Sequence, residues 1–123
     1  MFLHDWSESG LAGLKSDFGI SDQELEGVTI LLASYTYLNH SGEAFVLFER
    51  DGALYEVHGS HCSCYRLGDC GYRISGRGRT QWQPEETTVA ALIHRLDKGR
   101  VSGDYAEQLR TVLDAMQPAT ATA

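Results

Sequence analysis

Two histidines and two cysteines lie close together near the middle of the chain: His58, His61, Cys62 and Cys64. Imidazole nitrogens and thiolates are ligands that zinc prefers. A thiol beside an imidazole base is also the usual arrangement of a cysteine nucleophile. These residue types therefore point to two kinds of chemistry, a zinc site and a cysteine-dependent enzyme.

The spacing of these residues favours neither chemistry. Cys62 and Cys64 are separated by one residue, whereas the paired ligands of zinc fingers are usually separated by about two to four. No nucleophile motif surrounds either cysteine, although Glu56 or Glu86 could orient a histidine base. We therefore expect no catalytic residue and no cofactor, and zinc held by the two histidines and two cysteines stays the alternative.

Small residues around the cysteines favour a packed polar turn instead. Gly59 and Ser60 allow chain segments to approach closely, and cysteine in such a turn behaves as a small hydrophobic residue. Tyr65 and Trp82 are expected to anchor the turn to the core. Trp82 is predicted to be a core residue, as is Trp6, and it is also a candidate for partner contact.

The net charge of −7 is unevenly spread along the chain. Residues 1–49 contain eight acidic residues and one basic residue, Lys15. Residues 66–79 reverse this charge with Arg66, Arg73, Arg77 and Arg79, which could hold a phosphate or carboxylate or could simply be solvated. Because phosphate neutralisation supplies most affinity for nucleic acids, we expect no direct nucleic-acid binding. The acidic residues of segment 1–49 either face a basic partner or keep the protein soluble.

The chain shows no sign of membrane insertion or export. No apolar run approaches the roughly 20 residues that cross a bilayer. The first residues lack the basic and apolar regions of a signal peptide. We therefore expect a cytoplasmic protein whose three cysteines are free thiols.

Three successive strands are expected to position the histidine and cysteine segment. Residues 28–38 and 44–49 are rich in β-branched and aromatic residues, and residues 54–58 follow an Asp51-Gly52 hairpin turn. Alternation along the third strand places Glu56 and His58 on one face. Gly59 is expected to end or bend this strand.

Two amphipathic helices are expected to cover the sheet. Val89, Leu92, Ile93 and Leu96 form one apolar stripe, which Thr87 or Thr88 can cap. A second stripe consists of Tyr105, Leu109, Val112, Leu113 and Met116. The sequence therefore predicts an α+β domain over residues 1–117: a three-stranded antiparallel meander packed against two C-terminal helices, with short helical segments over residues 2–18. Residues 118–123 are expected to be a disordered tail.

Four segments resemble a family of small proteins encoded by bacteriophages and prophages: residues 33–37, 41–47, 55–65 and 81–87. The resemblance spans about residues 28–98, and the block His61-Cys62-Ser63-Cys64-Tyr65 is its most specific part. The family has no established activity. The resemblance thus implies a setting, the cytoplasm of an infected bacterium, and no particular reaction.

This chain departs from the family by carrying residues 66–80 where the relatives have only a few residues, and this insertion looks like an acquired contact surface. We therefore expect a phage-encoded protein that binds and inhibits a bacterial host or defence protein, as anti-CRISPR proteins do. The candidate contact residues are Tyr65, Arg66, Arg73, Arg77, Arg79 and Trp82. The alternatives are a metal-binding or cysteine-dependent enzyme, and an interaction module of phage replication or packaging.

Overall fold

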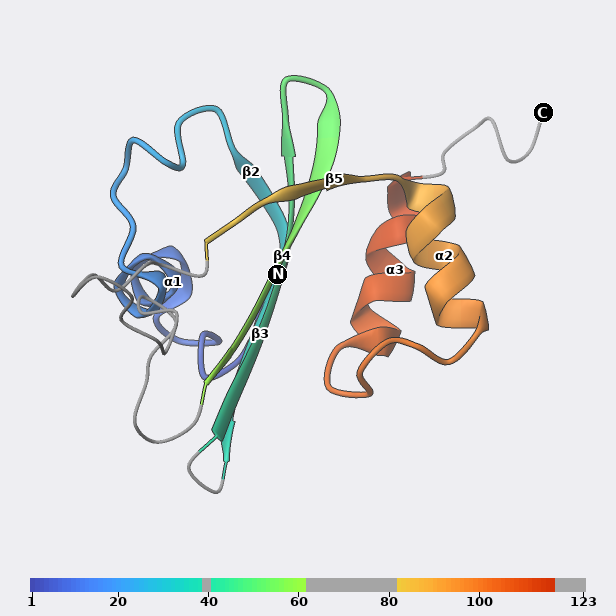
Figure 1. Ribbon diagram of the computed structural model, residues 1–123, viewed down its shortest axis with the longest axis horizontal. Coiled ribbons are helices and arrows are strands. Elements are labelled where there is room, and N and C mark those ends of the chain that lie inside the picture. The colour runs from blue at the N-terminus through green and yellow to red at the C-terminus, as the bar shows by residue number, and fades with distance from the viewer. Residues whose placement is uncertain (39–40, 62–81, 117–123) are drawn as a thin grey trace, which may run out of the picture.

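A computed structural model describes residues 1–38, 41–61 and 82–116. It shows an α+β fold in three layers (Figure 1). A five-stranded mixed sheet lies in the middle, with one helix on one face and two helices on the other. Within the described ranges, no helix is long and apolar enough to cross a membrane.

The strands follow the chain order across the sheet. They are β1 (Phe2–His4), β2 (Thr29–Leu38), β3 (Ser41–Arg50), β4 (Ala53–His61) and β5 (Glu85–Thr87). β1 runs parallel to β2, and every other neighbouring pair is antiparallel. The predicted meander corresponds to β2, β3 and β4, so that prediction is confirmed for the three central strands.

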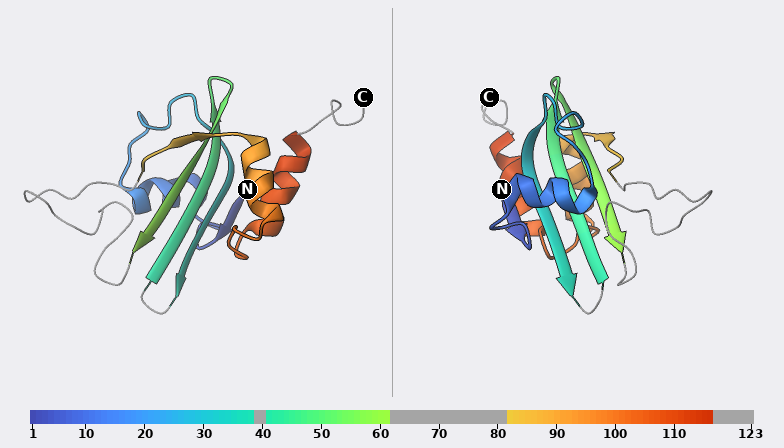
Figure 2. Two further views of the ribbon diagram at one scale, coloured as in Figure 1. Left: turned by 45° about the vertical axis from the view of Figure 1, so that its right-hand side comes forward. Right: turned by 90° about the vertical axis from the view of Figure 1, so that its left-hand side faces the viewer.

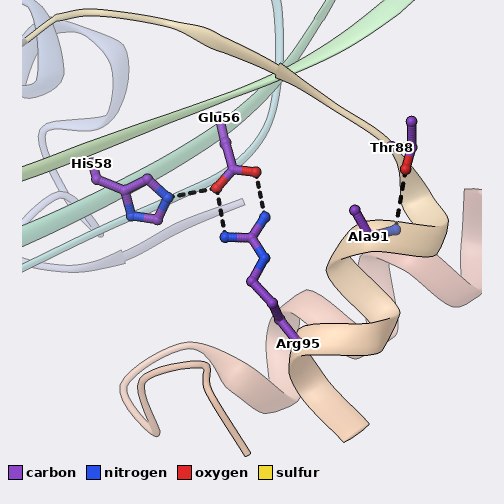
Figure 3. Close-up of polar contacts among 5 residues, drawn as sticks. All are labelled: Glu56, His58, Thr88, Ala91 and Arg95. Atoms are coloured by element: carbon purple, nitrogen blue, oxygen red, sulfur yellow. Dashed lines mark hydrogen bonds and ion pairs between the residues drawn. The ribbon is translucent and has the colours of Figure 1, made fainter. Parts of the chain in front are cut away.

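Both predicted C-terminal helices are present, as α2 (Val89–Asp97) and α3 (Ala106–Met116). The Thr88 hydroxyl accepts a hydrogen bond from the Ala91 backbone N–H at 3.1 Å, which caps the start of α2 (Figure 3). Gly99, just after α2, has a φ of 68°, a left-handed conformation that glycine adopts without steric cost. The threonine cap predicted for the start of this helix is therefore confirmed.

The N-terminal segment corrects one prediction. The helical interpretation of residues 2–18 holds only for α1 (Gly10–Phe18), because Phe2–His4 is a strand. This strand completes hydrogen bonds on the free edge of β2: the Ala33 N–H donates to the Met1 carbonyl at 2.8 Å, and the Asp5 N–H donates to the Tyr35 carbonyl at 2.9 Å. Pairing with the edge of β2 determined that Phe2–His4 is a strand. A segment of three residues is too short for a sequence pattern to predict this.

A second correction concerns the other edge and the end of β4. Gly59 does not end this strand: it pairs with Ala44, and β4 continues to His61. Glu85–Thr87, which the sequence did not predict as a strand, pairs with β4 as β5. Backbone hydrogen bonds to the neighbouring strands determine both outcomes, and local propensity does not predict them.

The hairpin between β3 and β4 confirms the predicted turn. Asp51 and Gly52 have φ values of 54° and 80°. A two-residue type I′ turn requires positive φ at both central residues, and Asp-Gly is among its preferred sequences. This local turn sets the register of β3 and β4.

Alternation along the strands divides the core into two clusters, one on each face of the sheet. Val46 and Phe48 face α1, whereas Phe45 and Leu47 face α2 and α3. The same alternation sends Val57 to the α1 face and the neighbouring Glu56 towards α2. Both faces of the central strands are therefore covered, as Figure 2 shows from two sides.

The two tryptophans are core residues, as predicted. Trp6 is fully buried, and its indole N–H donates to the Asp17 carboxylate at 2.7 Å. Trp82 is 7% exposed and packs between Phe18 and Phe48, with ring centroids 5.2 and 5.6 Å away. Each ring joins distant parts of the chain on the α1 face.

The α2 and α3 face yields a stability prediction. Leu109→Ala should lower the free energy of unfolding by about 2–5 kcal/mol, because it removes a side chain that is 1% exposed and leaves a cavity. Leu11→Ala is the matched control: Leu11 is 43% exposed, and its truncation should change stability by about 0.5 kcal/mol or less. Urea denaturation measures both values. Equal losses for the two variants would contradict the packing described here.

Candidate functional site

A buried carboxylate joins the sheet to α2 (Figure 3). Glu56 of β4 is 7% exposed and forms a bidentate ion pair with Arg95 of α2. One guanidinium nitrogen, Nη1, donates to Glu56 Oε1 at 2.9 Å, and the other donates to Oε2. A planar guanidinium matches a carboxylate in this geometry, so the pair fixes how α2 sits on the sheet.

The same carboxylate orients a histidine. His58 Nε2 lies 2.5 Å from Glu56 Oε1, and the imidazole is about half exposed. An ionised carboxylate only accepts hydrogen bonds, so Nε2 carries the proton in this contact. Nδ1 is then the acceptor nitrogen of the neutral ring. The imidazole is therefore held in one orientation and one tautomer.

Glu56 is ionised over a wide pH range. Burial raises its pKa, but hydrogen bonds from His58, Arg95 and Thr87, together with the charge of Arg95, outweigh burial and lower the pKa to about 2. Arg95 responds in the opposite sense: the hydrogen bonds to Glu56 raise its pKa. The two charges thus stabilise each other, and neither is available to another ion.

A pocket of about 220 Å³ opens beside His58. It lies on the α2 and α3 side of the sheet, where the C-terminal ends of β2 and β4 meet the N-terminal end of β3 and the turn before α3. Its described lining is mainly polar: Ser34, Glu43, Ala44, His58, Gly59, Ser60, Ser102, Asp104 and Tyr105.

Tyr105 forms one rigid wall of this pocket. Its ring stacks on Phe45 with centroids 4.3 Å apart and an interplanar angle of 5°. Burial raises the pKa of its hydroxyl to about 12; Arg95 opposes the shift, while the carboxylates of Glu56, Glu43 and Asp104 add to it. The phenol is therefore neutral at physiological pH and can donate a hydrogen bond.

The turn that carries Asp104 is tied to the sheet edge. His4 Nε2 donates to the Asp104 carbonyl at 2.7 Å, and the Thr36 hydroxyl donates to the Asp104 carboxylate at 3.4 Å. The Asp104 N–H donates to the Ser102 hydroxyl at 3.2 Å. These contacts connect β1, β2 and the turn, so the pocket is built from segments far apart in sequence.

The sequence-predicted site residues are only partly described. His58 borders the pocket, and the backbone of His61 pairs with Gly42 at the end of β4. Trp82 lies in the core, and its role in partner contact stays a prediction. The other candidates lie outside the described residues: Cys62, Cys64, Tyr65, Arg66, Arg73, Arg77 and Arg79. Among the residues that the structure describes, no group of three metal-ligating side chains occurs.

Sequence reasoning considered Glu56 as an orienting residue but missed Arg95 and the acidic residues of the pocket. A signal for Arg95 existed: it follows Leu92 by three residues and therefore borders the apolar stripe of α2. Glu43 and Asp104 carried no such signal, because each stands in a polar stretch next to a turn.

Comparison with known proteins finds no matching family model, no matching curated protein and no matching solved structure.

The ion pair yields a pH prediction. The folded-state pKa of Glu56 lies below its ordinary value of 4.5, so its ionised form contributes stability above about pH 4.5 and this contribution is lost as the pH falls towards 2. Glu56→Gln should therefore lower the free energy of unfolding by about 1–3 kcal/mol at pH 7. The difference from the unmodified protein should shrink between pH 4.5 and pH 2.

Urea unfolding at several pH values measures this difference. Glu86→Gln is the control, because Glu86 is an exposed carboxylate on the neighbouring strand β5. It should leave stability nearly unchanged at every pH. A Glu56→Gln defect that is equally large at pH 7 and pH 2 would contradict the assigned charge interaction.

Proposed function

We propose that this protein is a small phage-encoded protein that binds a bacterial host or defence protein, such as a CRISPR effector, and inhibits it by surface contact in the cytoplasm of the infected cell. The observation that carries the proposal is the excess of exposed acidic side chains on the described surface. The family resemblance of the sequence supplies the phage setting.

The acidic excess is strongest in the first half of the chain. Its exposed acidic residues are Asp5, Glu8, Asp22, Glu24, Glu26, Glu43, Glu49 and Asp51. The basic residues of this half are Lys15, which forms an ion pair with Asp22, and the exposed Arg50. Five of these acidic residues flank α1 in sequence, and α1 lies on the face of the sheet away from α2 and α3 (Figure 1).

An acidic surface of this kind suits a basic partner. Effectors that hold nucleic acids do so in positively charged channels, because they must contact phosphates along the strand. A protein with complementary charge is attracted to such a channel from a distance and can compete for it. This chemistry supports a defence protein that handles nucleic acid as the target.

The candidate contact segment is attached to the rigid body at both ends. β4 holds His61 opposite Gly42, and Trp82 is packed into the core between Phe18 and Phe48. Residues 66–80, which lie between these two points in the sequence, are the proposed site of partner contact together with Tyr65 and Trp82.

The acidic surface gives one prediction. Glu8→Lys/Glu26→Lys should weaken partner binding at least tenfold, because both residues are exposed and flank α1. The matched control is Glu49→Lys/Asp114→Lys, which makes the same charge change at two exposed positions away from α1. Affinity capture from bacterial lysate, followed by interferometry at two salt concentrations, measures the effect. Equal binding by both double variants would contradict the assignment of this surface.

The arginines of residues 66–79 give a separate prediction. Arg73→Glu/Arg77→Glu/Arg79→Glu should reduce partner binding and leave the melting temperature within a few degrees, because solvated charges contribute little stability. Binding and thermal melting are measured on the same preparation. A large fall in melting temperature would show that these arginines stabilise the fold instead.

The second candidate function is a cysteine-dependent or metal-binding enzyme. One observation favours it: Glu56 orients the His58 imidazole at the rim of a pocket, as a general base is oriented. Elemental analysis of the purified protein and a Cys62→Ser/Cys64→Ser variant test it. A metal-free protein whose activity survives this double substitution would remove the candidate. Capture of a phage replication or packaging protein would instead support an interaction module of that machinery.

A further inference from the structure

We propose that the pocket beside His58 binds the guanidinium group of an arginine side chain presented by the partner protein. That the arginine belongs to a partner rests on the proposed function above. That the pocket accepts a guanidinium group rests on its own geometry and charge, and can be tested without the partner.

The charges around the pocket select a cation. The charge of Arg95 reaches Tyr105 in the lining, but both of its terminal nitrogens are bound to Glu56, so these two charges cancel. Glu43 and Asp104 remain as formal negative charges in the lining, and none of the described lining residues is Lys or Arg. A cation entering the pocket is therefore attracted, whereas an anion is repelled.

A buried hydroxyl provides an independent indication of a ligand. Ser34 is 2% exposed and lines the pocket, and no described residue forms a hydrogen bond with its side chain. Every fully buried side-chain nitrogen or oxygen of the described residues nevertheless has a partner. The Ser34 hydroxyl is therefore not fully enclosed, and the pocket that Ser34 lines is where a polar ligand can satisfy it.

The shape of the polar lining favours guanidinium over a point charge. The lining includes the carboxylate residues Glu43 and Asp104 and the hydroxyl residues Ser34, Ser102 and Tyr105, which come from two strands and the turn before α3. A guanidinium group carries five N–H donors in a planar fork and can bond to several acceptors at once. An ammonium group has three donors on one atom and leaves more acceptors unpaired.

The volume of the pocket matches one side chain. A cavity of roughly 150 Å³ holds a benzene molecule, whereas sites for drug-sized ligands measure about 300–1,000 Å³. At about 220 Å³, this pocket lies between the two. A guanidinium group with part of its aliphatic stem is of this size.

The walls are held in place before any ligand arrives. Tyr105 is stacked on Phe45, and Glu56 orients the His58 ring, whose centroid lies 5.2 Å from that of Phe45. Hydrogen bonds from His4 and Thr36 hold Asp104. A ligand therefore orders few side chains on binding, which improves affinity.

Titration of the isotope-labelled full chain with Nα-acetyl-L-arginine methylamide, followed by NMR, tests the inference. We expect saturable shifts of the Ser34, Glu43 and Asp104 amide signals. The citrulline analogue, which is nearly isosteric and uncharged, should bind at least tenfold more weakly, as should the lysine analogue. Equal binding of the citrulline probe would overturn the proposal, and equal binding of the lysine probe would overturn the choice of arginine.

Variants locate the binding site. Glu43→Gln/Asp104→Asn should weaken binding of the arginine probe at least tenfold, whereas Glu49→Gln should not, although Glu49 lies on the same strand and is also exposed. Unchanged binding by the double variant would overturn the proposal. Should that variant unfold, Glu43→Gln alone decides the question, because Glu43 is exposed and belongs to neither core cluster.

The two proposals fail in different ways. Saturable binding of the arginine probe with no protein captured from lysate would remove the proposed function and leave the pocket assignment intact. Partner binding that is lost in Glu8→Lys/Glu26→Lys but unchanged in Glu43→Gln/Asp104→Asn would leave the proposed function intact and would overturn the claim that the partner's arginine occupies the pocket.

Discussion

The ion pair between Glu56 and Arg95 is the constraint on which the candidate site depends. A carboxylate buried on the face of β4 that packs against α2 and α3 is costly unless it is paired and hydrogen-bonded. Arg95 meets both needs, and in doing so it fixes the position of α2 against the sheet. The turn that follows α2 is thereby brought over the strand ends, where it closes the pocket beside His58. One electrostatic contact thus links the packing of the domain to the polar pocket beside His58.

The rest of the fold follows from covering both faces of three long strands. Side chains alternate along β3 and β4, so each strand contributes to two separate apolar clusters. α1 with Trp6 and Trp82 completes one cluster, and α2 with α3 completes the other. The short strands β1 and β5 occupy the two edges, which limits the exposed backbone that could pair with other chains. The result is a rigid central sheet that can present surfaces on either side.

Charge connects the surface with the pocket. Exposed acidic side chains outnumber basic ones in the first half of the chain, and the pocket repeats this bias with Glu43 and Asp104. The long-range field of such a surface increases the rate of encounter with a basic partner. A preformed pocket for a single cationic side chain would then add specificity to that encounter, because hydrogen-bond geometry distinguishes guanidinium from other cations.

The sequence by itself determined the elements whose causes are local. β-Branched and aromatic content predicted β2 and β3, Asp51-Gly52 predicted the hairpin to β4, and apolar stripes with a threonine cap predicted α2 and α3, because each pattern acts within a few residues. Tertiary structure alone decided that Phe2–His4 and Glu85–Thr87 are strands and that β4 passes through Gly59, because hydrogen bonds to a neighbouring strand outweigh weak local preference. It also decided the pocket, whose walls come from three strands and the turn before α3, and no local pattern records which distant side chains will meet.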